Sequence, residues 1–320
     1  MAVYTQVSAE EMVDLLARYD AGELISAKGI AEGVENSNYL IDTDNSRFIL
    51  TLYEKRVDAA DLPFFMALLD HLADRGLPVP RALRDCKGVQ IQTVAGRPAC
   101  LIEFLPGVSV SHPTNAQARA TGEALGAMHL ALADFDMQRP NTLGPEGWRA
   151  LAERCGSDLD RIAPGLADRI ATELAVIDQH WPTDLLHSVI HADLFPDNVL
   201  THHDAVTGVI DFYFACTEIR AWDLAVTHTA WCFENDGTRF DPARAAALVA
   251  GYESQMPLLP EERAAFQILT RGAALRFTLT RAWDWLNTPA DALVTRKDPL
   301  AFLRRLDFYV EADPVLLLGR

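Results

Sequence analysis

The sequence has few cysteines, and they form no arrangement that would build a site. Its 320 residues include five cysteines, an odd number, and none of them makes a C-x-x-C pair. This pattern argues against a disulfide framework and a structural zinc site, and it favours a reducing compartment. The chain also lacks an apolar run long enough to span a bilayer, and its first residues are acidic where a signal peptide is basic. We therefore expect a cytoplasmic protein with no membrane partner.

Basic residues are scarce as well. Lys and Arg together number 28 against 45 Asp and Glu, which gives a formal net charge of −17 at pH 7. Nucleic-acid phosphates are bound mainly through clustered basic side chains, so this balance argues against a nucleic-acid partner. Any phosphate bound by so acidic a chain is expected to arrive with a metal ion. The 49% of hydrophobic residues and 23% of charged ones are typical of a packed globular protein.

The first hundred residues alternate short apolar runs with turn residues. Ser8 and Glu11 form a capping-box pair that predicts a helix over 9–19. Apolar runs predict five strands and, between the third and the fourth, one helix over 61–75. The predicted strands cover 24–30, 38–41, 48–53, 89–94 and 99–105. These elements predict a small antiparallel lobe with a helix over residues 1–105, before Pro106 and Gly107.

Beyond Pro106 the pattern becomes helical. Helices are predicted over 116–132, 222–233, 242–254, 261–286 and 299–310, with shorter pieces between 146 and 177. Strand patterns occur there only around one polar loop. Two short apolar runs flank the loop within 189–200, and a third follows at 206–210. The fold class predicted is therefore α+β and bilobal, with a mainly helical second lobe over 106–320.

The polar loop within 189–200 carries the strongest chemical signal. His191, Asp193 and Asn198 stand in the order H-x-D-x-x-x-x-N, the spacing of a kinase catalytic loop. A carboxylate there reaches the attacking hydroxyl, and an amide oxygen a few residues later reaches the metal that neutralises the phosphates. Asp211 ends the next apolar run, where a second metal-binding carboxylate is expected. Asp193 is therefore the predicted base, and Asn198 and Asp211 are the predicted Mg²⁺ ligands. Because all three occur in the order and spacing of a kinase site, ordinary loop and turn roles are a poorer explanation.

These features together resemble the protein-kinase-like fold in its aminoglycoside-phosphotransferase branch. Within that branch, five segments look like the bacterial homoserine kinases. They are G-V-E-N-S-N-Y at 33–39, F-I-L-T-L-Y-E at 48–54, D-L-P-F-F at 61–65, G-L-P-V-P at 76–80 and R-G-A-A-L-R-F at 271–277. The resemblance covers nearly the whole chain. It implies phosphorylation of L-homoserine to O-phospho-L-homoserine with ATP and Mg²⁺, a step of threonine biosynthesis.

The resemblance also implies residues that brace the loop. His191 is expected to hold the loop through hydrogen bonds and to take no part in acid–base chemistry. Asp223, in W-D-L-A, resembles an aspartate that opens a helix and holds the loop backbone; the alternative is ordinary charge at a helix start. His129, at the end of a predicted helix, is interpreted as a core histidine.

The nucleotide site is predicted mainly from position. Gly33, with Ser37 after it, lies where a glycine-rich loop would cover the ATP phosphates, although a plain turn is the alternative. Glu103 and Leu105 lie where the backbone of a kinase linker would bind adenine. Thr51 replaces the phosphate-pairing lysine of V-A-I-K. Three candidates for the missing cation are Lys28, Lys55 and Arg56.

The amino-acid substrate, a zwitterion, needs a cation for its carboxylate. Arg276 lies in a long predicted helix among core-type residues, where an arginine needs a partner. That partner is either the substrate carboxylate or an acid of the chain, such as Asp223 or Glu218. Arg276 is thus the candidate substrate-binding residue.

Two other functions fit part of the pattern. One is a kinase of the same fold that acts on another small acceptor, such as an aminoglycoside, choline or methylthioribose. The acidic net charge of the chain favours this alternative, because it would attract a polycationic aminoglycoside. A pseudokinase or nucleotide-binding regulator would explain the threonine at position 51, but the intact Asp193, Asn198 and Asp211 argue against it. The expected partners are ATP and a small amino acid, and the oligomeric state stays open.

Overall fold

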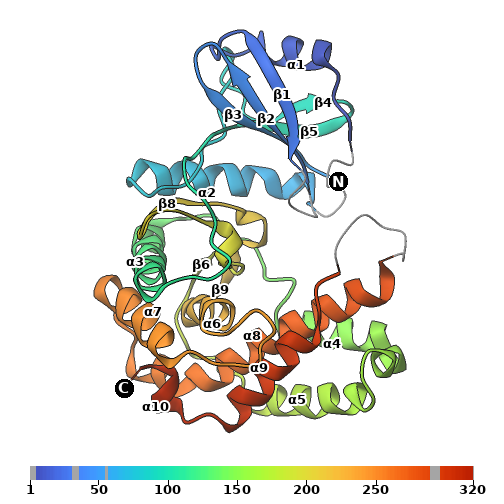
Figure 1. Ribbon diagram of the computed structural model, residues 1–320, viewed down its shortest axis with the longest axis vertical. Helices are drawn as coiled ribbons and strands as arrows, with labels where there is room; N and C mark the ends of the chain where they lie inside the picture. Colours follow the sequence, from blue (N-terminus) through green and yellow to red (C-terminus); the bar gives the residue numbers. More distant parts are fainter. Residues whose placement is uncertain (1–4, 31–35, 55–56, 289–295, 320) are drawn as a thin grey trace. The chain divides into compact units, whose positions relative to one another are not determined.

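The computed structural model describes residues 5–30, 36–54, 57–288 and 296–319 (Figure 1). The chain separates into two compact units. The first comprises Met1–Pro106 and Gly208–Tyr213, and the second comprises Gly107–Thr207 and Phe214–Arg320. A short segment that follows the polar loop therefore folds with the first unit.

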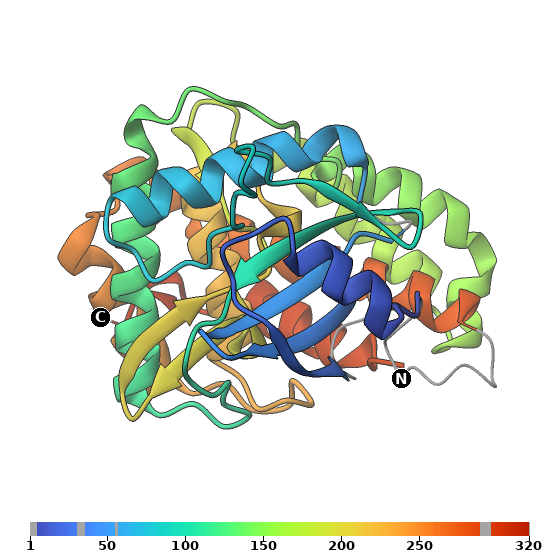
Figure 2. The same ribbon diagram turned by 90° about the horizontal axis from the view of Figure 1, so that it is seen from above.

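The first unit is built on a five-stranded antiparallel sheet, as predicted (Figures 1 and 2). The strands are β1 (Leu24–Ile30), β2 (Ser37–Thr43), β3 (Arg47–Leu52), β4 (Gln92–Val94) and β5 (Arg97–Glu103), in the order β1-β2-β3-β5-β4. β4 is shorter than the predicted strand over 89–94. Its expected start belongs to a turn, because the Asp85 carboxylate accepts hydrogen bonds from the amides of Lys87 (2.9 Å) and Val89 (2.8 Å).

Helices cover both faces of this sheet. α1 (Ala9–Leu16) begins at the capping box between Ser8 and Glu11 and buries its apolar side in the cluster that contains Leu101 of β5. α2 (Leu62–Asp74) packs on the opposite face, where Met66 contacts Cys100. Successive residues of a strand point to opposite faces, so neighbours in β5 serve two different cores.

The second unit is mainly helical, and the predicted helices all occur within a few residues of their expected bounds. They are α3 (Asn115–Ala131), α4 (Pro145–Cys155), α5 (Leu166–His180), α6 (Arg220–Trp231), α7 (Pro242–Gln255), α8 (Pro260–Asn287) and α9 (Leu300–Glu311). The one-turn α10 (Pro314–Leu317) was not predicted. Every residue of α6 from Ala221 to Trp231 is buried. A helix buried on all sides lies at the centre of its domain.

Two small sheets flank the polar loop in the sequence. β6 (His187–Ile190) pairs antiparallel with β9 (Cys216–Ile219), and β7 (Val199–His202) pairs with β8 (Ala205–Val209). β9 is absent from the prediction, because four residues that include a glutamate show no clear alternation. The loop therefore leaves β6 and enters β7, with strands on both sides.

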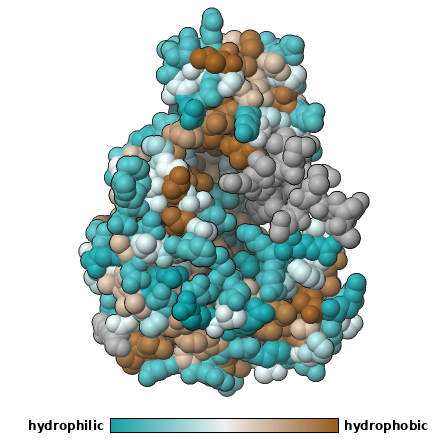
Figure 3. All heavy atoms as spheres, in the orientation of Figure 1, coloured by the Kyte–Doolittle hydropathy of each residue, from teal (hydrophilic) through white to brown (hydrophobic). Residues whose placement is uncertain are grey.

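The surface of the second unit is polar in the view of Figure 3, where apolar side chains are scattered over the visible face. In the described parts of the chain, no helix has the length and apolar character needed to cross a membrane.

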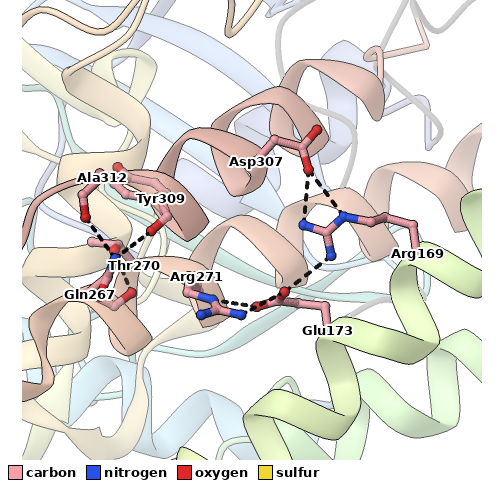
Figure 4. Close-up of polar contacts among 8 residues, drawn as sticks. All are labelled: Arg169, Glu173, Gln267, Thr270, Arg271, Asp307, Tyr309 and Ala312. Carbon is pink, nitrogen blue, oxygen red and sulfur yellow. Dashed lines mark hydrogen bonds and ion pairs between the residues drawn. The ribbon is translucent and has the colours of Figure 1, made fainter.

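A buried glutamate ties three helices of the second unit together (Figure 4). Glu173 on α5 is 1% exposed and accepts hydrogen bonds from Arg271 on α8 at 2.7 and 3.0 Å. It also accepts one from Arg169 at 3.2 Å, and Arg169 in turn donates to Asp307 on α9 at 3.0 and 3.2 Å. The single carboxylate thus neutralises charge from two helices and links both to a third.

A buried histidine in α6 makes folding sensitive to acid. His228 Nε2 donates to the Leu317 carbonyl oxygen at 3.1 Å, so Nδ1 accepts from the Tyr309 hydroxyl at 2.7 Å. Burial lowers the pKa of His228 from 6.5 to about 3. The unfolded chain therefore takes up a proton that the folded chain refuses, and this part of the stability is lost as the pH falls from 6.5 towards 3.

We expect His228→Gln to flatten the pH dependence of the free energy of unfolding. Between about pH 6 and pH 4, its slope should be smaller than that of the wild type by about 1.4 kcal/mol per pH unit. Denaturant titrations at several pH values measure this slope. Equal slopes for the wild type and His228→Gln would refute the prediction.

Candidate active site

Two of the predicted catalytic groups lie together in the loop between β6 and β7. The Asp193 side chain is 18% exposed, and Asn198 is 8% exposed. Asn198 Nδ2 donates to the backbone oxygen of Asp193 at 2.8 Å and to its Oδ2 at 3.3 Å. Because both amide hydrogens point to Asp193, the carbonyl oxygen of the Asn198 amide is the atom available to a cation.

The surroundings of Asp193 suit a proton acceptor. Burial raises the pKa of Asp193 to about 6, and the positive charges of Arg276, Lys297 and Arg281 oppose that shift. A carboxyl group with such a pKa is mostly ionised at neutral pH and is a stronger base than an ordinary aspartate. Strongly shifted carboxyl groups are common at catalytic sites.

Asp223 holds the start of the loop. It lies in the first turn of α6 and is fully buried. Its Oδ2 accepts from the His191 amide at 2.7 Å, and its Oδ1 accepts from the Ala192 amide at 2.8 Å. Burial by itself raises the pKa of Asp223, but interactions with His129 and His191 outweigh it and lower that pKa below 3.8. A bracing role would use these contacts, and that role of Asp223 stays a prediction.

A histidine from a distant helix supports Asp223. His129 on α3 lies with Nε2 at 3.1 Å from Asp223 Oδ2 and with Nδ1 at 2.9 Å from the Tyr252 hydroxyl on α7. The two helices approach closely at Gly122 and Gly251, where an added Cβ would lie 2.1 Å from a backbone oxygen of the facing helix. The sequence indicates only a core histidine here, because the contact depends on helix packing.

His191 is buried and makes a contact within the loop. Its Nδ1 accepts from the Asp193 amide at 3.2 Å, so the neutral ring carries its proton on Nε2. The ring is therefore a support for the backbone next to Asp193, and its bracing role stays a prediction.

Arg276 on α8 reaches the same loop. It is 2% exposed, its Nη1 donates to the Ala192 carbonyl oxygen, and its Nη2 lies 4.0 Å from Asp193 Oδ1. The guanidinium lies over the rings of Phe277 at 4.6 Å and Phe214 at 5.3 Å. The arginine thus has an acidic partner within the loop, and its predicted contact with a substrate carboxylate stays a prediction.

Asp211 belongs to the segment Gly208–Tyr213, which folds with the first unit. Its φ of +66° is uncommon for a residue other than glycine. Tyr213 anchors the segment: its ring meets that of Tyr53 edge-on with centroids 5.4 Å apart, and the two hydroxyl oxygens are 3.4 Å apart. The two predicted metal ligands are therefore divided between the units, since Asn198 lies in the second.

The predicted phosphate-covering residues belong to the first unit. Gly33 lies outside the described residues. Ser37 begins β2 and is fully buried. Its hydroxyl donates to Glu54 at 2.7 Å and accepts from the Thr5 amide at 3.0 Å. The Ser37 side chain is therefore used inside the unit, and its predicted nucleotide contact stays a prediction.

The predicted adenine-binding residues lie where the sheet ends. Glu103 is the last residue of β5; its amide donates to the Arg81 carbonyl oxygen at 2.9 Å, and its carboxylate accepts from the Arg81 amide at 3.1 Å. Leu105 is half-buried and follows the end of the strand. Its backbone is past the β5 ladder, as a backbone contact with adenine would require.

A threonine whose hydroxyl is hydrogen-bonded occupies the β3 position where protein kinases have a lysine. Thr51 on β3 is buried, and its hydroxyl donates to Asn38 on β2 at 2.8 Å. Lys28 is exposed on β1, and the other candidate cations, Lys55 and Arg56, lie outside the described residues.

The predicted metal ligands fit a hard divalent cation. Mg²⁺ prefers oxygen ligands and is commonly bound by one or two carboxylates together with waters and substrate phosphates. Asp211 has a carboxylate, and Asn198 has an amide oxygen whose orientation is set by hydrogen bonds to Asp193; that the two bind one cation stays a prediction. In the part of the chain that the structure describes, no three His, Cys, Asp or Glu side chains gather into a metal-binding cluster.

The family follows from similarity to known proteins. A family model described as "Phosphotransferase enzyme family" matches residues 26–265. Among solved structures, an amicoumacin kinase in complex with AMP-PNP, Ca²⁺ and Ami is similar with a TM-score of 0.69 at 14% identity, covering 96% of this chain and 95% of that one. The chain belongs to the phosphotransferase enzyme family and has its protein-kinase-like fold.

Relatives with more than half of their residues identical show which branch of this family the chain belongs to. The homoserine kinase of Zymomonas mobilis subsp. mobilis is 59% identical over 98% of both chains. The homoserine kinase of Azorhizobium caulinodans is 54% identical over 97% of this chain and 96% of its own. Within the phosphotransferase family, the chain belongs to the homoserine kinases.

Proposed function

We propose that this chain transfers the γ-phosphoryl group of ATP to the hydroxyl of L-homoserine. The products are O-phospho-L-homoserine, ADP and a proton, and the step belongs to threonine biosynthesis. The observation that carries the proposal is the 59% identity to a homoserine kinase over nearly the whole of both chains. The hydrogen-bonded pairing of Asp193 with Asn198 in one loop supports it, because this chemistry needs those two groups.

In this reaction Asp193 orients the substrate hydroxyl and accepts its proton. A bond forms between that oxygen and the γ-phosphorus, while the bond from phosphorus to the ADP oxygen breaks. Because the transition state is loose, the proton moves late and positioning contributes more than activation of the nucleophile. Asp223 and His191 keep the backbone on the N-terminal side of Asp193 in place through the hydrogen bonds described above.

Asn198 and Asp211 would hold Mg²⁺, which when bound neutralises charge on the phosphates. The nucleotide contacts of Gly33, Ser37, Glu103 and Leu105 belong to the same proposal. So do a nucleotide-binding lobe over 1–105, a catalytic and substrate lobe over 106–320, a cytoplasmic location, and the lack of nucleic-acid and membrane partners.

A panel of acceptors tests the function. With MgATP, we expect ADP release and a phosphomonoester product with L-homoserine. The kcat/KM for L-homoserine should exceed that for L-serine, L-threonine, choline, methylthioribose and kanamycin by about a hundredfold or more, since a site built for one set of polar groups rejects others. Preference for another acceptor would keep the kinase and replace homoserine. Bound ATP without turnover of any acceptor would favour a regulator.

A further inference from the structure

We propose that Arg276 is a positioning residue which, together with Asp223, clamps Ala192 and thereby aims the Asp193 carboxylate. The inference rests on the proposed function, because it treats Asp193 as the base of the reaction. It assigns Arg276 to the loop backbone and not to the substrate.

The backbone of Ala192 needs such a clamp. Its φ of +62° lies in the left-handed region, which a residue with a Cβ adopts only when its surroundings impose it. The amide of this buried residue donates to Asp223 Oδ1 at 2.8 Å, and its carbonyl oxygen accepts from Arg276 Nη1. Charged side chains from α6 and α8 therefore hold both polar backbone groups of the residue just before Asp193.

The shape of the guanidinium suits this task. One of its nitrogens reaches the Ala192 carbonyl oxygen while another lies 4.0 Å from the Asp193 carboxylate. The guanidinium carbon also lies 4.6 to 5.6 Å from the centroids of three rings, those of Phe214, Trp222 and Phe277. A planar, forked donor that stacks on aromatic rings can make these contacts together, whereas the ammonium of lysine offers a single point charge.

Kinetics distinguish the clamp from a substrate contact. A residue that binds the homoserine carboxylate changes KM, while one that aims the base changes kcat. We expect Arg276→Met to lower kcat by about a hundredfold, the size of effect that a displacement of about 1 Å can have, and to leave KM for homoserine within about threefold. Arg276→Lys keeps the charge without the fork and should recover about a tenth of wild-type kcat or less.

The matched control is Arg271→Met on the same helix. Arg271 pairs with the buried Glu173 on α5, which is not one of the groups shown to hold the loop, so its loss should lower thermal stability and leave kcat within about threefold. For Arg276→Met, a tenfold or larger rise in KM at unchanged kcat, or no change in either, would overturn the proposal.

A double-mutant cycle that combines Arg276→Met with Ala192→Gly tests whether Arg276 acts through the backbone of residue 192. Glycine adopts positive φ without the penalty of a Cβ, so Ala192→Gly makes the loop less dependent on its clamp. The loss of kcat caused by Arg276→Met should therefore shrink from about a hundredfold to about tenfold in the Ala192→Gly background. Equal losses in both backgrounds would mean that Arg276 does not act through this residue.

Hydrogen exchange separates this inference from the proposed function, since it needs no acceptor. In folded Arg276→Met, the backbone amides of Ala192 and Asp193 should exchange about tenfold faster than in the wild type, while those of α6 are unchanged. Unchanged exchange would overturn the clamp even if homoserine is the substrate. Absence of homoserine turnover by the wild type would overturn the function and leave the exchange result standing.

Discussion

Replacing Asp193 with asparagine is expected to lower kcat for L-homoserine by about 10²–10⁴-fold while the protein stays folded. The amide has nearly the same shape, and its oxygen can still accept the hydrogen bond from Asn198 Nδ2. It cannot accept the proton of the substrate hydroxyl. The loss should therefore appear in kcat, with binding of an ATP analogue within about threefold of wild type.

The same substitution should leave stability unchanged or raise it. Burial raises the pKa of Asp193 from 3.8 to about 6, so the folded protein disfavours the carboxylate charge more than the unfolded chain does. A raised pKa adds stability at low pH, and that contribution is lost as the pH rises through about 6. At neutral pH the buried charge of Asp193 therefore lowers the stability of the folded protein, and Asp193→Asn removes that charge.

Steady-state ADP release, calorimetry with an ATP analogue and thermal unfolding together test this prediction. Asp197→Asn is the matched control, because Asp197 lies in the same loop with its side chain 63% exposed. Its kcat should stay within about threefold of wild type. Residual activity of Asp193→Asn above about a tenth of wild type would show that another group accepts the proton.

The sequence predicted those parts of the site whose geometry is local in the chain. Asp193 and Asn198 meet across a short loop with a 3₁₀ turn at Pro196–Asn198, so their spacing alone implies their contact. The helices were equally predictable, because their buried faces repeat with the helical period. The sheet of the first unit followed from turn residues between apolar runs.

Contacts between distant elements were beyond the sequence. His129, Tyr252 and Asp223 come from three helices, and they meet only because α3, α6 and α7 pack in one arrangement. The left-handed backbone of Ala192 was equally hidden, because positive φ is signalled by glycine and this residue is alanine. Arg276 was singled out as a buried cation that needs a partner, but periodicity could not show that its partners are the Ala192 carbonyl oxygen and the Asp193 carboxylate.

Asp223→Asn is the second substitution for which a large effect is expected, and it should damage both stability and catalysis. The buried carboxylate lies within hydrogen-bonding distance of the amides of His191 and Ala192 and of His129 Nε2. An asparagine offers one oxygen, and its NH₂ group would face donors. Each buried donor left without an acceptor costs about 1–3 kcal/mol, and a loop displaced by about 1 Å can lose about a hundredfold in kcat.

Two measurements distinguish Asp223→Asn from Asp193→Asn: the free energy of unfolding and the steady-state kcat. Asp223→Asn should lower both, whereas Asp193→Asn should lower kcat alone. Asp241→Asn is the matched control, because Asp241 also starts a helix, accepting from the Arg244 amide at 3.0 Å, but belongs to α7. Asparagine caps a helix about as well as aspartate, so Asp241→Asn should lower stability by less than about 1 kcal/mol, mainly through the weakened ion pair with Arg244, and leave kcat unchanged. If Asp223→Asn kept wild-type stability and kcat, the loop conformation would have to be set by other contacts, since the two amide hydrogen bonds to Asp223 would then carry no measurable energy.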